Sequence, residues 1–286
     1  MCSNNKVRFI FTIGESTGYR IIKELVKNKS IHTKAIISSS KNYDNLIKDI
    51  CKKKNIPFFN KQNFKNKILI IKNIAMECDY LFSLYSSIII PEEILLSLNK
   101  YSINLHPGSL PYYAGKNCVS GAIYNNETDF GITIHKMTKE IDAGDIIFTK
   151  RVRINKNDTA FSLMEKLKLV SIKSVNEFLK KTNNLTKVKS IKNNIKKRKK
   201  FPKYIPNNGL VSAYMSFDVL EKIYRASYFG PHESPWGNIK FKYKSKIYKI
   251  RKMIKIKKIN DDYGIKKVDK NSYKLNNKRF TYILYI

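Results

Sequence analysis

Three side chains of this 286-residue sequence have the chemistry that a proton-coupled acyl transfer needs. Asn104 and His106 are separated by one residue directly before Pro107, and Asp142 follows in the run Glu-Ile-Asp-Ala-Gly-Asp that ends at Asp145. An amide N–H can stabilise an oxyanion, an imidazole can donate or accept a proton, and a carboxylate can orient the imidazole or take up a proton. This chemistry requires a fold that brings the three side chains together.

The elements around Asn104 and His106 predict such a fold. Apolar runs at 79–84 and 101–105 read as buried strands, with a short helix over 91–98 between them. Strands that alternate with helices indicate βαβ units and a parallel sheet. Ligands of such sheets bind at the carboxyl ends of the strands, which is where Asn104 and His106 lie.

Two further segments extend this pattern. A strand is expected over 131–137, and a tight turn over 142–145 could return a carboxylate to the same edge. At the amino terminus we expect a strand over 6–13, a glycine turn over 14–18 and a helix over 19–27. Together these predict an α/β fold, a Rossmann-like and mostly parallel sheet flanked by helices, followed by a small C-terminal β-rich domain.

The glycine turn has two interpretations. A turn at a helix N-terminus can hold a phosphate through free backbone N–H groups, which makes Gly14 a candidate substrate-binding residue. The alternative is a simple strand-to-helix turn. The spacing Gly14-x-x-x-Gly18 is neither a dinucleotide fingerprint nor a Walker loop.

Four motifs occur in order: Asn-x-His-Pro at 104–107, Leu-Pro-Tyr-Tyr-Ala-Gly at 110–115, Gly-Ile-Thr-Ile-His at 131–135 and Ile-Asp-Ala-Gly-Asp-Ile-Ile at 141–147. Together they resemble the folate-dependent formyltransferases, which include methionyl-tRNA, glycinamide ribonucleotide and sugar-nucleotide N-formyltransferases. The match extends over residues 6–180. The resemblance implies an enzyme that transfers a formyl group from the co-substrate 10-formyltetrahydrofolate to a primary amine.

The resemblance also assigns roles. The family's catalytic trio corresponds to Asn104, His106 and Asp142. The amide of Asn104 would donate to the oxyanion of the attacked formyl group, and so would His106 if protonated. Asp142 would hold the imidazolium and accept the amine's proton through a water. His135 is either a buried structural histidine or a residue that contacts the substrate.

The folate pocket is expected between two segments, one after the strand at 79–84 and one before Asp142. Their residues are Ser86, Ser87, Ile88 and Ile89, and Lys139, Glu140 and Ile141. Backbone groups would read the pterin edge while Ile88 and Ile141 enclose the ring, although core packing is an equal alternative for both isoleucines. The chain departs from the family after His-Pro, where it reads Gly108-Ser109-Leu110.

We expect a catalytic domain over 1–182, a basic linker over 183–205 and a small β-rich domain over 206–286. A long helix should begin after Asp158-Thr159. In the last domain we expect a helix over 217–228 and then antiparallel strands at 239–243, 246–254, 272–276 and 279–286. We expect its core to contain Tyr224, Tyr228, Phe229 and Trp236.

The charge is concentrated in the second half of the chain. Residues 1–150 contain 21 basic and 13 acidic residues, a net of +8, so subtraction from the formal +34 leaves +26 for residues 151–286. This predicts attraction to polyanions such as tRNA, a nucleotide diphosphate or an anionic membrane surface. However, 48 of the 56 basic residues are lysine, a composition that AT-rich coding produces without selection for binding.

Local features favour a small substrate over tRNA. The tRNA formyltransferases resemble one another in a basic insertion after the second strand and in an Arg-Gly-Ala-Ala-Pro pattern. The corresponding stretches of this chain are Ser-Ser-Ser-Lys-Asn-Tyr-Asp at 38–44 and Ala-Gly-Lys-Asn-Cys at 114–118, so both signatures are missing. The expected substrate is therefore a nucleotide-linked amino sugar. Two alternatives stay open: a methionyl-tRNA formyltransferase, and a non-catalytic protein that binds RNA or another polyanion on the same fold.

The remaining features complete the expectation. The four cysteines lack Cys-x-x-Cys spacing, so neither a zinc site nor a disulfide framework is indicated, and no metal is expected. The sequence shows no leader and no apolar run of membrane-spanning length, so we expect a cytoplasmic protein with no membrane partner. Sheet-rich carboxyl-terminal modules often pair, which makes a homodimer one option.

Overall fold

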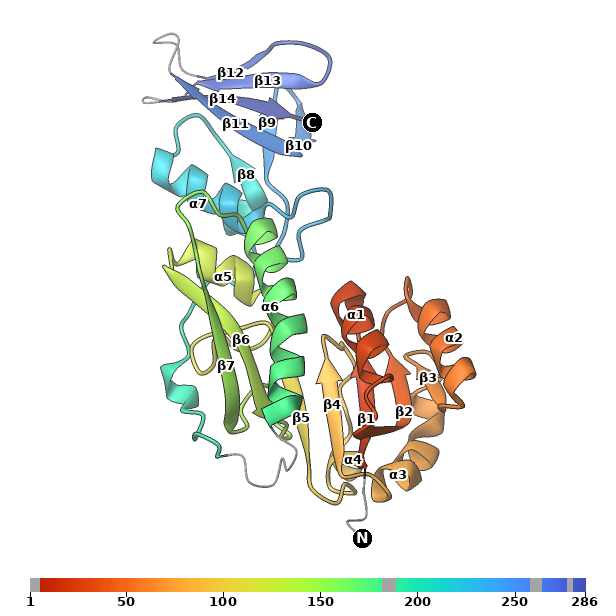
Figure 1. Cartoon of the computed structure of the whole chain (residues 1–286). Coiled ribbons are helices and arrows are strands. Elements are labelled where there is room, and N and C mark those ends of the chain that lie inside the picture. The colour runs from red at the N-terminus through yellow and green to blue at the C-terminus, as the bar shows by residue number, and fades with distance from the viewer. Residues whose placement is uncertain (1–5, 182–188, 258–263, 277–279) are drawn as a thin grey trace. The chain divides into compact units, whose positions relative to one another are not determined.

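The structure is a computed structural model and describes residues 6–181, 189–257, 264–276 and 280–286 (Figure 1). The chain forms two compact units, each built from separate segments. The first comprises Met1–Gly115, Gly131–Arg151 and Leu167–Arg198, and the second comprises Lys116–Phe130, Val152–Lys166 and Lys199–Ile286. The three consecutive domains expected from the sequence stay a prediction. Within the compact units, residues 189–198 of the expected linker belong to the first.

A seven-stranded sheet is the framework of the first unit, and its strand order is β3-β2-β1-β4-β5-β6-β7 (Figure 1). Strands β1 to β5 run parallel, and β6 is antiparallel to β5. This confirms the predicted α/β fold with a mostly parallel sheet flanked by helices. The strands are β1 (Val7–Ile13), β2 (Ile31–Ser38), β3 (Phe58–Asn60), β4 (Tyr80–Leu84), β5 (Tyr101–His106), β6 (Asp129–Lys136) and β7 (Ile146–Arg153).

Helices connect and cover these strands. They are α1 (Glu15–Leu25), α2 (Asp44–Lys54), the 3-10 turn η1 (Lys65–Lys67), α3 (Ile68–Met76), α4 (Glu92–Leu95) and α6 (Ala160–Lys181). Helix α6 begins directly after Asp158-Thr159, as predicted. The side chain of Asp158 accepts from the backbone N–H of Asn155 and contacts Lys166, which holds the chain at the start of this helix.

Strands β1 and β4 have apolar residues on both of their faces. Successive side chains of a strand point to opposite faces, so a strand covered on both faces needs apolar residues at every position. Ile10 and Leu81 belong to a core cluster with residues of α3 and α4. On the other face Phe82 packs edge-on against Phe178 of α6, with ring centroids 6.1 Å apart.

The described part of the second unit contains two small sheets, the helices α5 (Cys118–Tyr124) and α7 (Phe217–Ser227), and the first residues of α6. One sheet has the order β10-β9-β8 and the other β11-β14-β13-β12. The strands are β8 (Leu210–Val211), β9 (Lys240–Tyr243), β10 (Lys246–Lys249), β11 (Lys252–Lys257), β12 (Gly264–Lys267), β13 (Ser272–Asn276) and β14 (Phe280–Tyr285), with 3-10 turns η3 (Ile195–Lys197) and η4 (Pro206–Gly209). The predicted β-rich C-terminal region is confirmed.

Some details of this region differ from the expectation. The run 246–254 forms two strands of different sheets: the N–H of Ile250 still donates to Ile239 beside β9, whereas that of Arg251 donates to Tyr285 of β14. Trp236 is buried, as expected, and donates from Nε1 to the carbonyl of Pro202 at 2.7 Å. The other three expected core residues are only half-buried, and strand residues such as Phe241 and Tyr282 supply the core instead. No helix in the described part of the chain has the length and apolar character needed to cross a bilayer.

Candidate active site

Strand β5 brings Asn104 and His106 to the carboxyl end of the parallel strands. In the antiparallel register with β6, Asn104 lies opposite His135 and His106 lies opposite Thr133. Residues that face each other across neighbouring strands are close enough for side-chain contact. The pairing therefore places a second imidazole beside the Asn-x-His motif, a position that chain order alone does not indicate.

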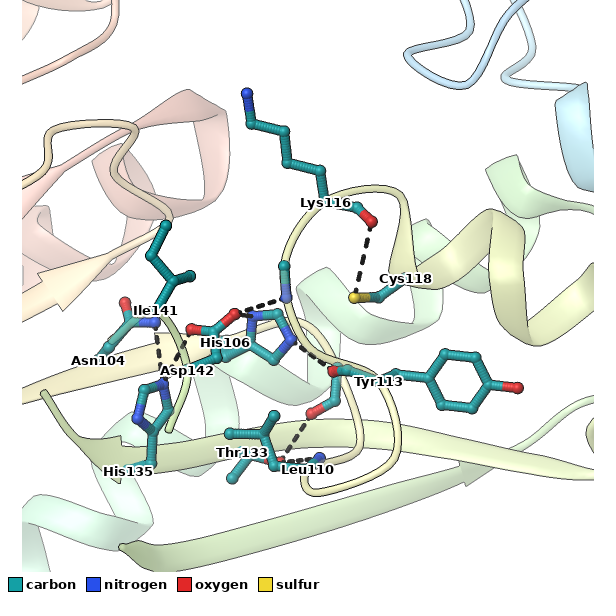
Figure 2. Close-up of polar contacts among 12 residues, drawn as sticks. Asn104, His106, Leu110, Tyr113, Lys116, Cys118, Thr133, His135, Ile141 and Asp142 are labelled. Carbon is teal, nitrogen blue, oxygen red and sulfur yellow. Dashed lines mark hydrogen bonds and ion pairs between the residues drawn. The ribbon is translucent and has the colours of Figure 1, made fainter. Parts of the chain in front are cut away.

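The loop between β6 and β7 brings Asp142 to the same place. Figure 2 shows its carboxylate between the two imidazole rings. Oδ2 lies 3.4 Å from Nδ1 of His106, and Oδ1 lies 3.3 Å from Nε2 of His135. The backbone N–H of Gly115 also donates to Oδ2 at 2.8 Å. The expected convergence of Asn104, His106 and Asp142 is thus present, with His135 as a fourth member.

Backbone carbonyls orient both rings. Nε2 of His106 lies 2.9 Å from the carbonyl of Tyr113, and Nδ1 of His135 lies 2.7 Å from the carbonyl of Lys136. Because a carbonyl only accepts, each of these nitrogens carries a proton. In a neutral His106, Nδ1 is then an unprotonated acceptor that faces Asp142. Nε2 of His135 lies 3.2 Å from Nδ2 of Asn104 and 3.3 Å from Oδ1 of Asp142: without a proton it accepts from the amide, and with one it donates to the carboxylate.

The pKa values of His106 and Asp142 are both lowered, but for different reasons. Burial lowers the pKa of His106 below 6.5, His135 and Arg198 lower it further, and Asp142 and the carbonyl of Tyr113 oppose the change. For Asp142, burial would raise the pKa, but the contact with His135, the charge of His106 and the N–H of Gly115 outweigh it. The pKa of Asp142 therefore lies well below 3.8. Near pH 7 the site contains an ionised carboxylate beside a neutral imidazole.

The departure at Gly108 has a steric reason. A Cβ atom at this position would lie 2.2 Å from Nε2 of His106 and 2.7 Å from the carbonyl oxygen of Tyr113. The carbonyl of Gly108 also accepts from the buried hydroxyl of Thr133 at 2.7 Å, and that hydroxyl accepts from the N–H of Leu110. The glycine thus makes room for the ring, and Thr133 holds the loop against β6.

We expect Gly108→Ala to lower kcat by about 10- to 100-fold, because the added methyl group must displace the ring of His106 or the loop at Tyr113. Steady-state kinetics measure this effect. Ser109→Ala is the matched control, since it changes the next residue of the loop and removes a buried hydroxyl for which the described residues provide no partner. Equal kcat values for the two variants would contradict the steric argument.

The two segments expected to hold the folate lie close together. Lys139 forms a 3.4 Å ion pair with Glu92, at the start of the helix that follows Ser86–Ile90. The side chain of Ile88 is 8% exposed and packs in the core, which is the alternative left open by the sequence. Ile89 and Ile141 are 78% and 60% exposed. The apolar side chains available to a ring are therefore Ile89 and Ile141, not Ile88.

The other members of these segments have these contacts: Ser86 donates to Ser39 Oγ at 3.4 Å, the N–H of Ser87 donates to the same oxygen at 3.1 Å, and Glu140 lies 3.4 Å from Arg198. Their roles toward a cofactor stay a prediction.

Gly14 has a structural role that the sequence left as the alternative. It precedes α1, and a Cβ atom there would lie 2.0 Å from the carbonyl oxygen of Tyr85. Its N–H donates to the carbonyl of Leu84 at 3.0 Å, so this N–H is not available to a phosphate. The close approach of β1 and β4 explains the glycine, and its expected substrate contact receives no support from this geometry.

Other contacts of the site join segments that are distant in sequence. The side chains of Asn193 and Arg198 donate to backbone carbonyls of the Asp142 loop. No local pattern in a lysine-rich run predicts such contacts. In the described part of the chain, no group of three or more His, Cys, Asp or Glu residues is arranged to hold a metal ion.

Comparison with known proteins follows from this fold and geometry. A family model described as formyl transferase matches residues 5–177. This match covers more than half of the chain, and the chain therefore belongs to the formyl transferase family.

One curated relative is the bifunctional polymyxin resistance protein ArnA of Wigglesworthia glossinidia brevipalpis, 34% identical over 142 residues. The match covers 50% of this chain and 22% of that protein, so the chain spans less than a quarter of the relative's length.

Two solved structures share the fold. A 4-N formyltransferase from Francisella tularensis has a TM-score of 0.67 at 20% identity, covering 85% of this chain and 96% of the other. An N-formyltransferase from Helicobacter canadensis, in complex with folinic acid and dTDP-3-aminofucose, has a TM-score of 0.67 at 18% identity, covering 98% of both chains. At these identities the likeness concerns the fold.

Proposed function

We propose that this protein transfers a formyl group from 10-formyltetrahydrofolate to the primary amine of a nucleotide-linked amino sugar. One observation carries the proposal: an amide, two imidazoles and an ionised carboxylate converge at the carboxyl end of β5, with Asp142 between the rings. The chain's membership of the formyl transferase family supports the reaction class.

Asn104 has the geometry of an oxyanion donor. A primary amide has two N–H groups, and the contact with His135 uses one of them. The second can donate to the oxygen that gains negative charge when an amine attacks a formyl carbon. His135 acts in this scheme as a positioning residue that fixes the rotation of the amide. This role corresponds to the buried structural histidine, one of the two alternatives left open by the sequence, and contact with the substrate stays a prediction.

His106 and Asp142 can take up the proton that the attacking amine loses. Near pH 7 His106 is neutral, and its Nδ1 faces the carboxylate of Asp142 at 3.4 Å. A proton received there is stabilised on one side by the carboxylate and on the other by the N–H contact with Tyr113. His106 would then act as a proton acceptor, and the proton would pass to N10 of the folate as the bond between N10 and the formyl carbon breaks. The sequence had left its protonation state open.

The residues at the expected folate segments fit an aromatic co-substrate. The exposed side chains of Ile89 and Ile141 come from the two expected segments, and Lys139 of one segment lies 3.4 Å from Glu92, just after the other. Exposed apolar side chains next to backbone donors and acceptors suit a flat heterocycle. When bound, 10-formyltetrahydrofolate would supply the reactive formyl carbon.

Two observations support an amino sugar as the acceptor. The Helicobacter canadensis enzyme, whose fold matches over 98% of both chains, binds dTDP-3-aminofucose. The chain also lacks the two local signatures of tRNA formyltransferases at 38–44 and 114–118. A nucleotide diphosphate would be attracted to a protein with a formal net charge of +34.

The test is a panel assay that follows folate release from 10-formyltetrahydrofolate with dTDP- and UDP-linked amino sugars and with methionyl-tRNA. We expect turnover with at least one amino sugar and none with methionyl-tRNA. Turnover with methionyl-tRNA alone, together with tRNA binding that weakens steeply with salt, would replace the amino sugar by tRNA as the acceptor. RNA binding without folate release from any amine would leave a non-catalytic polyanion-binding protein.

A further inference from the structure

The chain returns to the Asp142 loop long after leaving it. Beyond α6, Ile191 pairs with Ile146, the first residue of β7, through two reciprocal backbone hydrogen bonds of 2.8 Å. This bridge lies just beyond the loop that carries Asp142. It places the following residues of the lysine-rich run alongside the loop of Asp142. A run of solvated lysines would not by itself require this position.

Asn193 is the buried residue of this returning segment. It is 7% exposed, and its Nδ2 donates to the carbonyl of Asp142 at 2.9 Å and to that of Gly144 at 3.2 Å. The two carbonyls fix the orientation of the amide, because a flipped amide would place its own oxygen against two acceptors. Oδ1 is buried and has no partner among the described residues. The polar contacts of this side chain therefore come from Nδ2 and go to the loop.

Arg198 reaches the same loop from the end of the returning segment. One guanidinium nitrogen donates to the carbonyls of Ile141 and Asp142 at 3.1 and 3.4 Å, and another lies 3.4 Å from a carboxylate oxygen of Glu140. The carbonyl of Asp142 is therefore held by two side chains. This segment thus contacts Glu140, Ile141, Asp142 and Gly144 of the loop.

The conformation of Asp142 explains why such support is needed. Its φ is +52°, in the left-handed region that a residue with a side chain rarely adopts. A residue in such a conformation persists when its surroundings over-determine it. On the opposite side of the turn Gly144 packs so closely on β6 that a Cβ atom would lie 2.0 Å from the carbonyl of Lys136. Strand β6 and the returning segment thus hold the turn from two sides.

We propose that Asn193 is a positioning residue, which holds the left-handed turn at Asp142 and thereby keeps the carboxylate between His106 and His135. The inference rests on the proposed function for its effect on turnover. The placement of the Asp142 carboxylate beside His106 does not depend on any substrate and can be tested without one.

Asn193→Leu tests the proposal because it keeps the side chain's size and adds no charge, while it removes the donor to both carbonyls. We expect kcat to fall by about 10- to 100-fold with the KM values for folate and amine changed less than about twofold. We also expect the pKa of His106, followed by imidazole NMR without substrate, to fall toward its value in Asp142→Asn. The substitution removes none of the three side chains that act on this ring, Asp142, His135 and Arg198.

The NMR and kinetic results separate this inference from the proposed function. If the wild-type protein released folate with none of the amines tested, the proposed function would be refuted. The titration of His106 would still decide the role of Asn193. An Asn193→Leu variant with the wild-type titration of His106 would overturn the positioning role. Should this variant fail to fold, Asn193→Ala takes its place with the same two outcomes.

Asn276→Ala serves as the matched control for Asn193→Ala. Asn276 is also 7% exposed and accepts from the hydroxyl of Thr281 at 2.9 Å in the second unit. The Asn276→Ala variant should lose stability without any change in the titration of His106. If it altered that titration to the same extent, the effect of Asn193 would be attributed to general loosening, and the proposal would be wrong.

Discussion

Asp142→Asn should lower kcat by about 10²- to 10⁴-fold while leaving the fold intact, because the ionised carboxylate that stabilises the proton on His106 is lost. The fold should survive since asparagine tolerates the left-handed conformation at φ +52°, and its side-chain oxygen can still accept from the N–H of Gly115. Steady-state kinetics and circular dichroism measure the two effects.

The same variant has a defined effect on pH dependence. Asp142 raises the pKa of His106, so its removal lowers that pKa further below 6.5. If a neutral His106 is required, activity falls as the pH drops through this pKa. The acid limb of kcat in Asp142→Asn therefore moves to lower pH, at a reduced plateau. An acid limb that moves to higher pH, or stays in place, would contradict the pairing.

Asp145→Asn is the control for this substitution. Asp145 lies three positions further along the same loop, and its side chain is 44% exposed at 3.8 Å from Lys136. The same loss of one carboxylate there should change kcat less than about twofold, because exposed ion pairs contribute little. A comparable loss in both variants would indicate a general effect of charge on the loop.

The parts of this site that could be predicted depend on short spacings along single elements. Asn104 and His106 stand at the end of one buried strand, and the ordered motifs identified Asp142 as their partner. Strand β4 was predictable because it is buried at every position and therefore consists mostly of apolar residues. Element order then sufficed for the mostly parallel sheet.

The parts that could not be predicted depend on register and on distant segments. His135 touches Asn104 because the antiparallel pairing of β5 and β6 places them opposite each other, and no chain pattern specifies that register. Ile88 and Ile89 are adjacent, yet one packs in the core and the other is exposed, because burial alternates along this segment, with Ile88 and Ile90 buried and Ile89 exposed. The contacts of Asn193 and Arg198 arise in a run whose composition indicates only a solvated linker.

Asn104→Ala should lower kcat by about 10²- to 10³-fold with little change in either KM, which is the loss that one oxyanion donor typically causes. Asn104→Asp is the sharper variant, since it keeps the shape of the side chain but removes both N–H donors and adds a negative charge beside the developing oxyanion. We expect its activity to be no higher than that of Asn104→Ala. Asn99→Ala, at an exposed position just before β5, should retain wild-type kinetics. Because aspartate can accept but not donate, substantial turnover by Asn104→Asp would show that the amide contributes something other than its N–H group.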